Sequence, residues 1–231
     1  MHAASSKPEL NQWVPPPPTT TPLDWAPLAI IDLSRFDEQG GKLALAKELA
    51  DAVRQWGFWV IIGTGIPQEQ VDRVFAIGDA FFKLSKDEKQ AITCDHAEGN
   101  NFGYRGNTRL VGQTDVVENV EMLNIPKYIP EYDSILRHEF LEAFYDELAP
   151  FHRLLWDRAI RKLYILFAII LELPENCASP TDLFWATPDV FFWQLQYHPR
   201  PAEDDEKIGS NWTYGHTGKE SGYRHFFVPA L

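Results

Sequence analysis

Hydrophobic positions along the first part of the chain alternate between strand-like and helix-like spacing. Short, continuous apolar runs at 27–33 and 58–62 predict two strands. The second run is apolar at every position, which is typical of a central strand covered on both faces. Apolar residues then recur at helical spacing over 42–56 and again after Pro67, a residue favoured at the first position of a helix. This region is therefore predicted to run strand, helix, strand, helix.

The middle of the chain combines a polar loop with a long helical stretch. Residues 85–88 (SKDE) form a capping box that opens a further short helix. Residues 94–112 are rich in Gly and Asn and indicate a long loop, and 116–125 predict a strand region. Helical spacing then extends over 134–173. We expect this stretch to bend or break at Pro150, which lacks a backbone donor.

Later in the chain the pattern changes to a period of two. Over 191–197, larger apolar side chains alternate with positions that include two glutamines, as in a half-buried strand. The acidic residues 203–206 lack the alternating ligand spacing of a calcium loop, so they predict a solvated loop. Residues 1–26, rich in Pro and Thr, predict a disordered leader. The predicted fold class is α/β (α+β), with an N-terminal strand-helix region and long helices.

Composition and charge narrow the class of protein. The 231 residues are 45% hydrophobic, which is enough for a sizeable core. The 21 Lys and Arg against 33 Asp and Glu give a net charge of −12, which argues against a nucleic-acid or anionic-membrane partner. The longest apolar run, 163–171, is about half of what a membrane span needs. Two cysteines exclude a disulfide scaffold and a CxxC metal site, and we expect a cytoplasmic protein.

Two local patterns could carry chemistry. Gly63-Thr-Gly65 lies between a predicted strand and helix, but Gln68 stands where a dinucleotide-binding fingerprint needs its third glycine. We interpret it as a plain strand-to-helix turn. His216 lies in the sequence WTYGHT, and by itself such a histidine is more often structural or exposed than a metal ligand.

Several segments, taken in order, resemble a known family. Residues 27–33 (PLAIIDL), 56–66 (WGFWVIIGTGI) and 81–89 (FFKLSKDEK) resemble the N-terminal region of the non-haem iron, 2-oxoglutarate-dependent dioxygenases, most closely the isopenicillin N synthase-like branch. The similarity continues with FGY at 102–104, Glu121, QYHPR at 196–200 and YGHT at 214–217. It covers residues 27–217.

The resemblance implies a domain division and a chemistry. It implies a dioxygenase N-terminal domain over 27–183 and the start of a double-stranded β-helix (jelly roll) over 184–231. In the family, two histidines and a carboxylate hold Fe(II), and 2-oxoglutarate chelates it while a small organic substrate is oxidised, in some members in secondary metabolism. His216 matches the first iron ligand. Tyr197 and His198 match the cosubstrate side, and many relatives have tyrosine where His198 stands.

The chain also departs from the family. Gly218 stands where the iron-binding aspartate belongs, and neither the second histidine nor the cosubstrate-anchoring arginine is matched. From residue 184 the chain supplies about three strands, whereas a jelly roll needs eight. We therefore expect an incomplete, truncated jelly roll, with His216 as a remnant ligand and neither Fe(II) nor 2-oxoglutarate bound by this chain.

Two functional hypotheses follow. In the first, the complete protein oxidises a small organic substrate and this chain is inactive as written. In the alternative, the chain is a non-catalytic interaction module built on its N-terminal domain. Glu121 and residues 102–104 could line a substrate cavity, or they could serve core packing or a tight turn. The sequence leaves open the substrate, the oligomeric state and the origin of the truncation.

Overall fold

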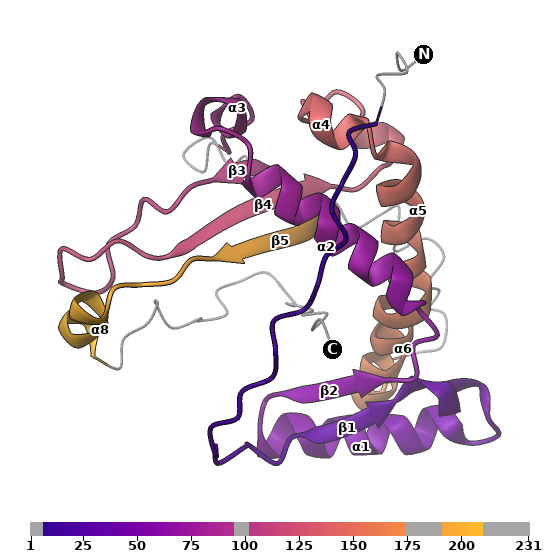
Figure 1. Ribbon diagram of the computed structural model, residues 1–231. Helices are drawn as coiled ribbons and strands as arrows, with labels where there is room; N and C mark the ends of the chain where they lie inside the picture. The colour runs from indigo at the N-terminus through magenta and orange to yellow at the C-terminus, as the bar shows by residue number, and fades with distance from the viewer. Residues whose placement is uncertain (1–6, 95–101, 174–190, 210–231) are drawn as a thin grey trace. The chain divides into compact units, whose positions relative to one another are not determined.

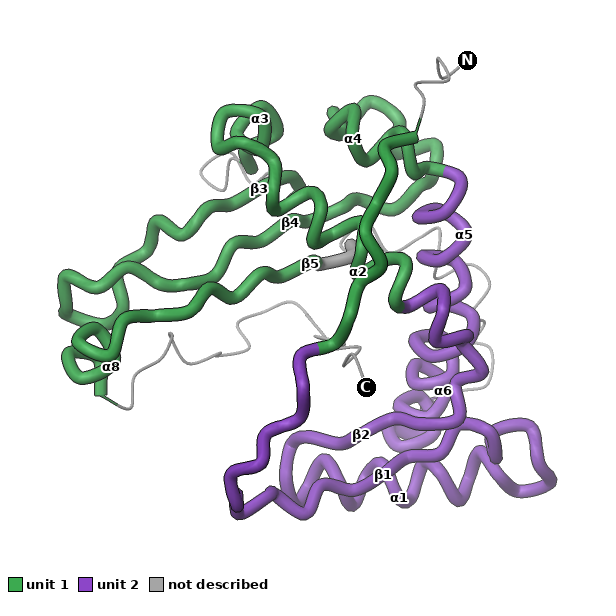
Figure 2. Tube along the Cα trace, in the orientation of Figure 1, with its two compact units in different colours: residues 1–15, 72–145, 191–231 green, residues 16–71, 146–190 purple. Residues whose placement is uncertain are grey.

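The protein divides into two compact units that interleave along the sequence. The computed structural model describes residues 7–94, 102–173 and 191–209, with only the backbone at 191–193. Unit 1 comprises residues 1–15, 72–145 and 191–231, and unit 2 comprises 16–71 and 146–190 (Figure 2). Both contain helices and strands (Figure 1), so the predicted mixture of helix and sheet is confirmed.

Unit 2 is built on a two-stranded parallel sheet. Strand β1 (Ala29–Asp32) pairs with β2 (Trp59–Ile62), and helix α1 (Gly41–Gln55) connects them after a 3-10 turn, η1 (Leu33–Asp37). A helical crossover is the usual way to join parallel strands. Helix α6 (Arg161–Ile170) packs against α1. The fully buried aliphatic residues of this unit come from β1, η1, α1 and α6: Ile31, Leu33, Leu45, Leu49, Leu163 and Leu166.

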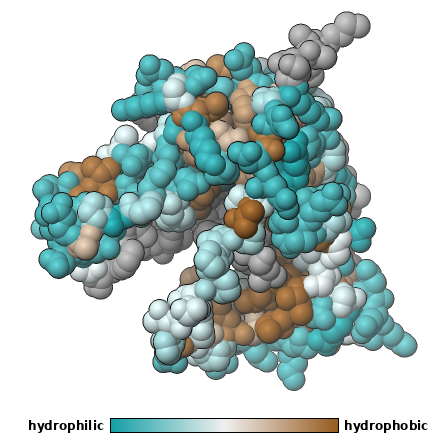
Figure 3. Space-filling view, in the orientation of Figure 1, coloured by the Kyte–Doolittle hydropathy of each residue, from teal (hydrophilic) through white to brown (hydrophobic). Residues whose placement is uncertain are grey.

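The second face of this sheet is apolar and exposed. Ile30, Val60 and Ile62 alternate with better-covered neighbours and are 59%, 38% and 42% exposed, and Phe58 just before β2 is also exposed. Figure 3 shows an apolar area over this part of unit 2. The prediction that 58–62 is a central strand covered on both faces is therefore wrong for the described part of the chain. A continuous apolar run reveals a preference for burial but not what is available to cover it.

Unit 1 contains a three-stranded antiparallel sheet in the order β3-β4-β5. Its strands are β3 (Gly103–Arg105), β4 (Val120–Pro126) and β5 (Phe191–Tyr197). The strand predicted at 191–197 is confirmed, whereas the predicted loop 94–112 contains β3. Gly103 explains this difference. Its φ of +110° suits only glycine, and a side chain there would overlap the Ile92 carbonyl, so glycine lets two backbone segments approach closely.

The helices of unit 1 follow some of the sequence signals and depart from others. Helix α2 (Gln68–Phe82) begins directly after Pro67, and α3 (Lys86–Gln90) has both hydrogen bonds of the predicted capping box. Short turns η3 (Pro130–Tyr132) and α4 (Glu139–Glu142) follow later. The acidic stretch predicted as a loop forms α8 (Ala202–Ile208) instead. Three of its four carboxylates occupy the first helical turn, where unpaired backbone N–H groups favour negative charge.

The stretch predicted as helical over 134–173 becomes helical only at Glu139 and is irregular at 143–144 and after Leu155, but not at Pro150. Pro150 lies inside α5 (Tyr145–Leu155), and the irregular segment is a π-helical turn, η4 (Trp156–Ile160), that leads into α6. The predicted break at Pro150 is therefore wrong. Pro150 is the sixth of the eleven residues of α5, so it removes one intrahelical hydrogen bond without ending the helix.

The described residues contain five strands in two small sheets, and these do not form a jelly roll. β5, predicted to lie in the jelly-roll region, pairs with β4 along its whole length. The stretch 210–231, with His216 and Gly218, lies outside the described residues, so the incomplete jelly roll and its domain boundary stay predictions. Among the described helices, none has both the length and the apolar character for crossing a membrane.

The contact between α2 and β5 generates a first prediction. The Gln194 amide donates to the Val74 carbonyl at 3.2 Å, and a side chain at Gly78 would overlap Gln194. Gly78→Ala should therefore displace Gln194 and cost about 1 kcal/mol of unfolding free energy. In a Gln194→Ala background the same change should instead stabilise by about 0.5–1 kcal/mol, because alanine is the better helix former. Urea denaturation of the four proteins measures this, and equal effects in both backgrounds would contradict it.

Candidate functional site

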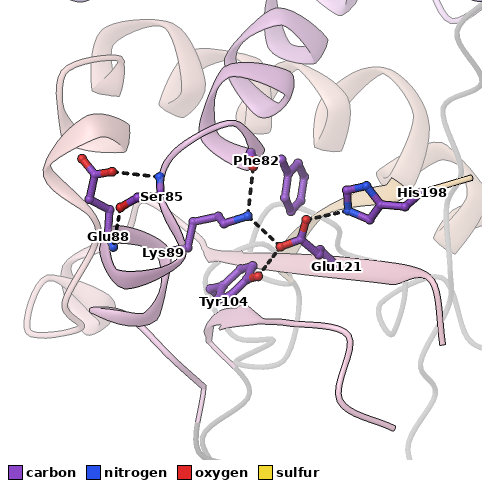
Figure 4. Close-up of polar contacts among 7 residues, drawn as sticks. All are labelled: Phe82, Ser85, Glu88, Lys89, Tyr104, Glu121 and His198. Atoms are coloured by element: carbon purple, nitrogen blue, oxygen red, sulfur yellow. Dashed lines mark hydrogen bonds and ion pairs between the residues drawn. The ribbon is translucent and has the colours of Figure 1, made fainter. Parts of the chain in front are cut away.

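A buried carboxylate on β4 gathers polar side chains from three other segments (Figure 4). The side chain of Glu121 is only 7% exposed. Its Oε1 atom accepts hydrogen bonds from Lys89 Nζ, at 2.7 Å, and from the Tyr104 hydroxyl. Its Oε2 atom lies 2.6 Å from His198 Nε2. Both carboxylate oxygens are therefore occupied by partners that lie far away in the sequence.

The register of the sheet explains how Tyr104 and His198 reach the same carboxylate. Glu121 lies opposite Gln196, so His198 is its diagonal neighbour on the same face of the sheet. On the other side, Tyr104 lies opposite Leu123, two residues beyond Glu121, and is again diagonal to it. Side chains two residues apart on a strand share a face, so this register alone brings the three polar groups together.

The backbone of His198, the first residue after β5, is fixed to Asn119, the residue just before β4. Its N–H donates to the Asn119 carbonyl at 2.8 Å, and the Asn119 amide donates back to the His198 carbonyl at 2.6 Å. Arg200 donates to the Asn119 side-chain oxygen at 3.0 Å. These contacts hold the His198 ring beside Glu121.

Lys89 reaches the site from α3, on the helical side. The capping box of Ser85 and Glu88 defines the start of this short helix, and the Lys89 side chain, 9% exposed, then points into unit 1. Its ammonium group also donates to the Phe82 carbonyl at 2.9 Å, one of the carbonyls at the end of α2 without an intrahelical donor. Lys89 thus provides a hydrogen-bond donor for a carbonyl at the end of α2 and balances the negative charge of Glu121.

The electrostatics of the cluster keep Glu121 ionised. Burial raises the pKa of Glu121, but hydrogen bonds from Lys89, Tyr104 and His198 more than offset this, so the pKa lies below its usual value of 4.5. Burial, together with the hydrogen bond to Glu121, raises the pKa of the Tyr104 hydroxyl well above its usual 10.0. Tyr104 is therefore a neutral donor at physiological pH. Because a carboxylate can only accept, the Nε2 atom of His198 carries a proton.

The structure brings some of the sequence-predicted residues together and separates others. His198 joins Glu121 and Tyr104, whereas Tyr197 lies on the opposite face of the strand and is 62% exposed. The Phe102 ring packs against that of Tyr132 in a tilted arrangement, with centroids 5.1 Å apart and planes at 60°. His216 lies outside the described residues. Tyr197 and His198 therefore do not share one face of the sheet.

Sequence reasoning missed Lys89 as a member of the site. It lies 32 residues before Glu121, and on an amphipathic helix a lysine is normally solvated. The sequence signal that could have indicated Lys89 was the capping box at 85–88. It defines where α3 begins, and therefore which side of this helix Lys89 occupies. Only the tertiary structure shows that this side faces the sheet.

The described residues do not provide an iron site. Within 7–94, 102–173 and 191–209, no three His, Cys, Asp or Glu side chains gather as metal ligands. The one buried carboxylate of the cluster has an ammonium, a phenol and an imidazole as partners. The arrangement can orient and charge-balance His198, but it does not fit a facial triad of two histidines and a carboxylate.

Comparison with known proteins identifies the class. The family model described as "non-haem dioxygenase in morphine synthesis N-terminal" matches residues 28–143, half of the chain. Leucoanthocyanidin dioxygenase 2 of Oryza sativa subsp. japonica is 28% identical over 194 residues, which is 80% of this chain and 51% of that protein. The UPF0676 protein C1494.01 of Schizosaccharomyces pombe is 27% identical over 194 residues, 80% of this chain and 57% of that protein.

Solved structures show the same fold. A full-length Neurospora crassa protein, solved in complex with alpha-KG, has a TM-score of 0.62 at 21% identity, and the match covers 80% of this chain and 58% of that one. A putative 2OG-Fe(II) oxygenase of Caulobacter crescentus has a TM-score of 0.54 at 17% identity, over 66% of this chain and 51% of its own. This chain therefore shares its fold with part of each of these two proteins. The chain belongs to the non-haem Fe(II)/2-oxoglutarate-dependent dioxygenase family, and it spans about half the length of the two relatives compared over 194 residues.

The buried ion pair predicts a large loss of stability when one partner is removed. Glu121→Ala should cost roughly 3–5 kcal/mol of unfolding free energy, because it leaves the Lys89 ammonium buried without its counter-charge. The exposed pair between Lys83 and Asp79 provides the control, and Asp79→Ala should cost less than about 1 kcal/mol. Urea denaturation compares the two variants. Similar losses in both would show that burial of Glu121 carries no special penalty.

The lowered pKa of Glu121 predicts a specific acid sensitivity. A carboxyl whose pKa is lower in the folded than in the unfolded protein stabilises the fold above its unfolded pKa, here about 4.5, and this stabilisation is lost as the pH falls through the folded value. The melting temperature of the wild type should therefore fall more steeply below pH 4.5 than that of Glu121→Gln. Thermal melts from pH 3 to 7 measure the difference, and parallel curves would refute it.

Proposed function

We propose that the complete protein is an oxidoreductase that uses Fe(II) and 2-oxoglutarate to oxidise a small organic substrate. The observation that carries this proposal is the family match over residues 28–143. The names of relatives support the substrate class. Four of them are leucoanthocyanidin dioxygenases, and the N. crassa protein was solved with alpha-KG and, in a second structure, with 5-formyluracil as well.

Within this proposal, His198 contacts the cosubstrate. It follows β5 directly, its ring is held by Glu121, and 42% of its side chain remains exposed and available to a ligand. Tyr197, the second cosubstrate-side candidate, points to the other face of the sheet. The geometry therefore favours His198 of the two.

For the iron, the proposal assigns His216 as a remnant ligand. The position two residues later holds Gly218, which has no side-chain oxygen to coordinate the metal. The described residues supply no substitute cluster. We therefore propose that this chain, as written, does not hold Fe(II) in a facial triad and does not turn over 2-oxoglutarate.

A second candidate function is a non-catalytic interaction module. The exposed apolar face of β1 and β2, with Ile30, Phe58, Val60 and Ile62, favours it, because apolar residues gathered on one surface often mark an interaction site. This candidate requires neither iron nor cosubstrate. Iron binding and turnover therefore separate the two functions.

The experiment measures iron and turnover in the 231-residue chain and in a Gly218→Asp variant. The wild type should bind less than stoichiometric Fe(II) and release no succinate from 2-oxoglutarate, because a ligand is missing. Gly218→Asp should raise Fe(II) affinity, and the matched variant Gly218→Asn should raise it less. Stoichiometric iron that is lost on His216→Ala, with turnover in the wild type, would overturn the proposed inactivity. Absence of turnover in a longer form carrying Asp at 218 would overturn the oxygenase proposal.

A further inference from the structure

We infer that the four consecutive prolines at 15–18 (the proline run), together with Val14 before them, form a docking site for a partner domain that binds a polyproline II helix in an uncharged groove lined by aromatic side chains. The run lies before the family match, which begins at residue 28. The inference goes beyond the oxygenase function, because it requires neither iron nor cosubstrate.

The amino-acid sequence of the run determines its backbone conformation. The proline ring fixes φ near −65°, and a residue that precedes a proline is directed toward extended ψ values. Residues 15–17 are prolines that also precede a proline, so both dihedral angles favour polyproline II. Consistent with this, residues 7–28 contain no helix or strand (Figure 1), and the described residues contain no cis peptide bond.

The proline run is exposed over its whole length. Every residue from 14 to 27 is exposed, and Val14 is exposed to 73%. Within the described part of the chain, residues 14–18 take part in no hydrogen bond or ion pair. The proline carbonyls can therefore accept hydrogen bonds from another molecule, and the proline rings and Val14 can be covered by its apolar side chains.

Trp13 holds the chain directly before the run. Its ring lies against the Phe75 ring of α2, with centroids 4.8 Å apart and planes at 30°. Both residues belong to unit 1. A segment that is tethered at one end and stiffened by four prolines has little conformational freedom left to lose on binding. Docking of the run is therefore less costly in entropy than docking of a flexible segment.

The period of the polyproline II helix gives the run a repeated apolar ridge. This helix has three residues per turn and rises about 3.1 Å per residue. The pairs Val14-Pro15 and Pro17-Pro18 are therefore one turn apart and lie on the same side, about 9 Å from each other. Prolines at 15 and 18 also form the PxxP pattern that aromatic-lined grooves recognise.

The charges around the run select the kind of groove. Between residues 8 and 34 the chain has no Lys or Arg, and its charged residues are Glu9, Asp24 and Asp32. An acidic groove would gain no ion pair from this segment and would be repelled by its carboxylates. Of the domains that bind polyproline II helices, the charge pattern therefore favours EVH1 and WW domains over an SH3 domain with an acidic pocket.

The first test titrates 15N-labelled EVH1, WW and SH3 domains, each separately, with the unlabelled 231-residue chain. Signals from the aromatic groove of the EVH1 or the WW domain should shift, and the SH3 domain should bind more weakly. If none of the three domains responds, the run acts only as a stiff spacer and the inference is overturned. A response of the SH3 domain alone would overturn the assignment of an uncharged groove.

The second test removes the ridge. Pro15→Ala combined with Pro18→Ala should weaken binding by about tenfold or more, because both prolines of the PxxP pattern are lost and the backbone is freed. Pro8→Ala combined with Pro22→Ala is the matched control, since these two prolines are exposed and lie outside the run. The control should bind like the wild type, and equal losses in both double variants would contradict docking at the run.

Both double variants should keep the fold of the wild type. The four substituted prolines are exposed, and exposed substitutions outside special features change stability little. Urea denaturation of the two double variants and the wild type should therefore give the same midpoint. The loss of binding is then assigned to the run itself.

A third test addresses the charge argument. Thr20→Arg places a cation two residues after Pro18, and it should raise the affinity for the SH3 domain with an acidic pocket about threefold or more. Thr20→Gln is the neutral control and should leave that affinity unchanged. An SH3 affinity that does not rise in Thr20→Arg would show that charge around the run does not select the groove.

Discussion

The carboxylate of Glu121 is the group on which the described part of unit 1 most depends. Burying an ion is costly unless its lone pairs are used and its charge is balanced, and Glu121 meets both conditions through partners on α3, β3 and the residues after β5. Each partner is therefore constrained by the others. The cluster ties a short helix and three strands into one arrangement that few alternative packings could satisfy.

This constraint also gives the exposed end of β5 a defined chemistry. Without Glu121, His198 would be a half-exposed ring with either tautomer accessible. With it, the Nε2 atom is committed to the interior of unit 1. The buried charge thus orients the His198 ring, because the hydrogen bond made by one ring nitrogen determines how the other is placed.

The two units differ in how completely they cover their sheets. In unit 1, α2 packs on the face of the sheet that carries Gln194, Glu121 and His198. In unit 2, the face with Ile30, Val60 and Ile62 remains exposed in the described residues. An apolar face of this kind gains stability only when something covers it. The family relationship rests on the match over residues 28–143. Within the described residues, no three His, Cys, Asp or Glu side chains gather as metal ligands.

Local signals in the sequence were sufficient for most helix and strand positions. The capping box at 85–88, Pro67 at the start of α2 and the period-two pattern at 191–197 each depend on contacts within a few residues, and each is confirmed. Two predictions failed because the same local signal is compatible with more than one structure. Pro150 lies inside α5 without breaking it. The acidic residues of α8 favour the first turn of a helix as well as a loop.

The site itself was decided by tertiary structure. The sequence by itself established the family resemblance and selected Glu121, Tyr104 and His198 as candidates, but it left open whether they were packing or chemistry, and it paired His198 with Tyr197. Strand register places those two neighbours on opposite faces and brings Glu121, Tyr104 and His198 onto one. Lys89 joins them from α3. Register and helix orientation depend on contacts between distant segments, and no spacing within a single segment encodes them.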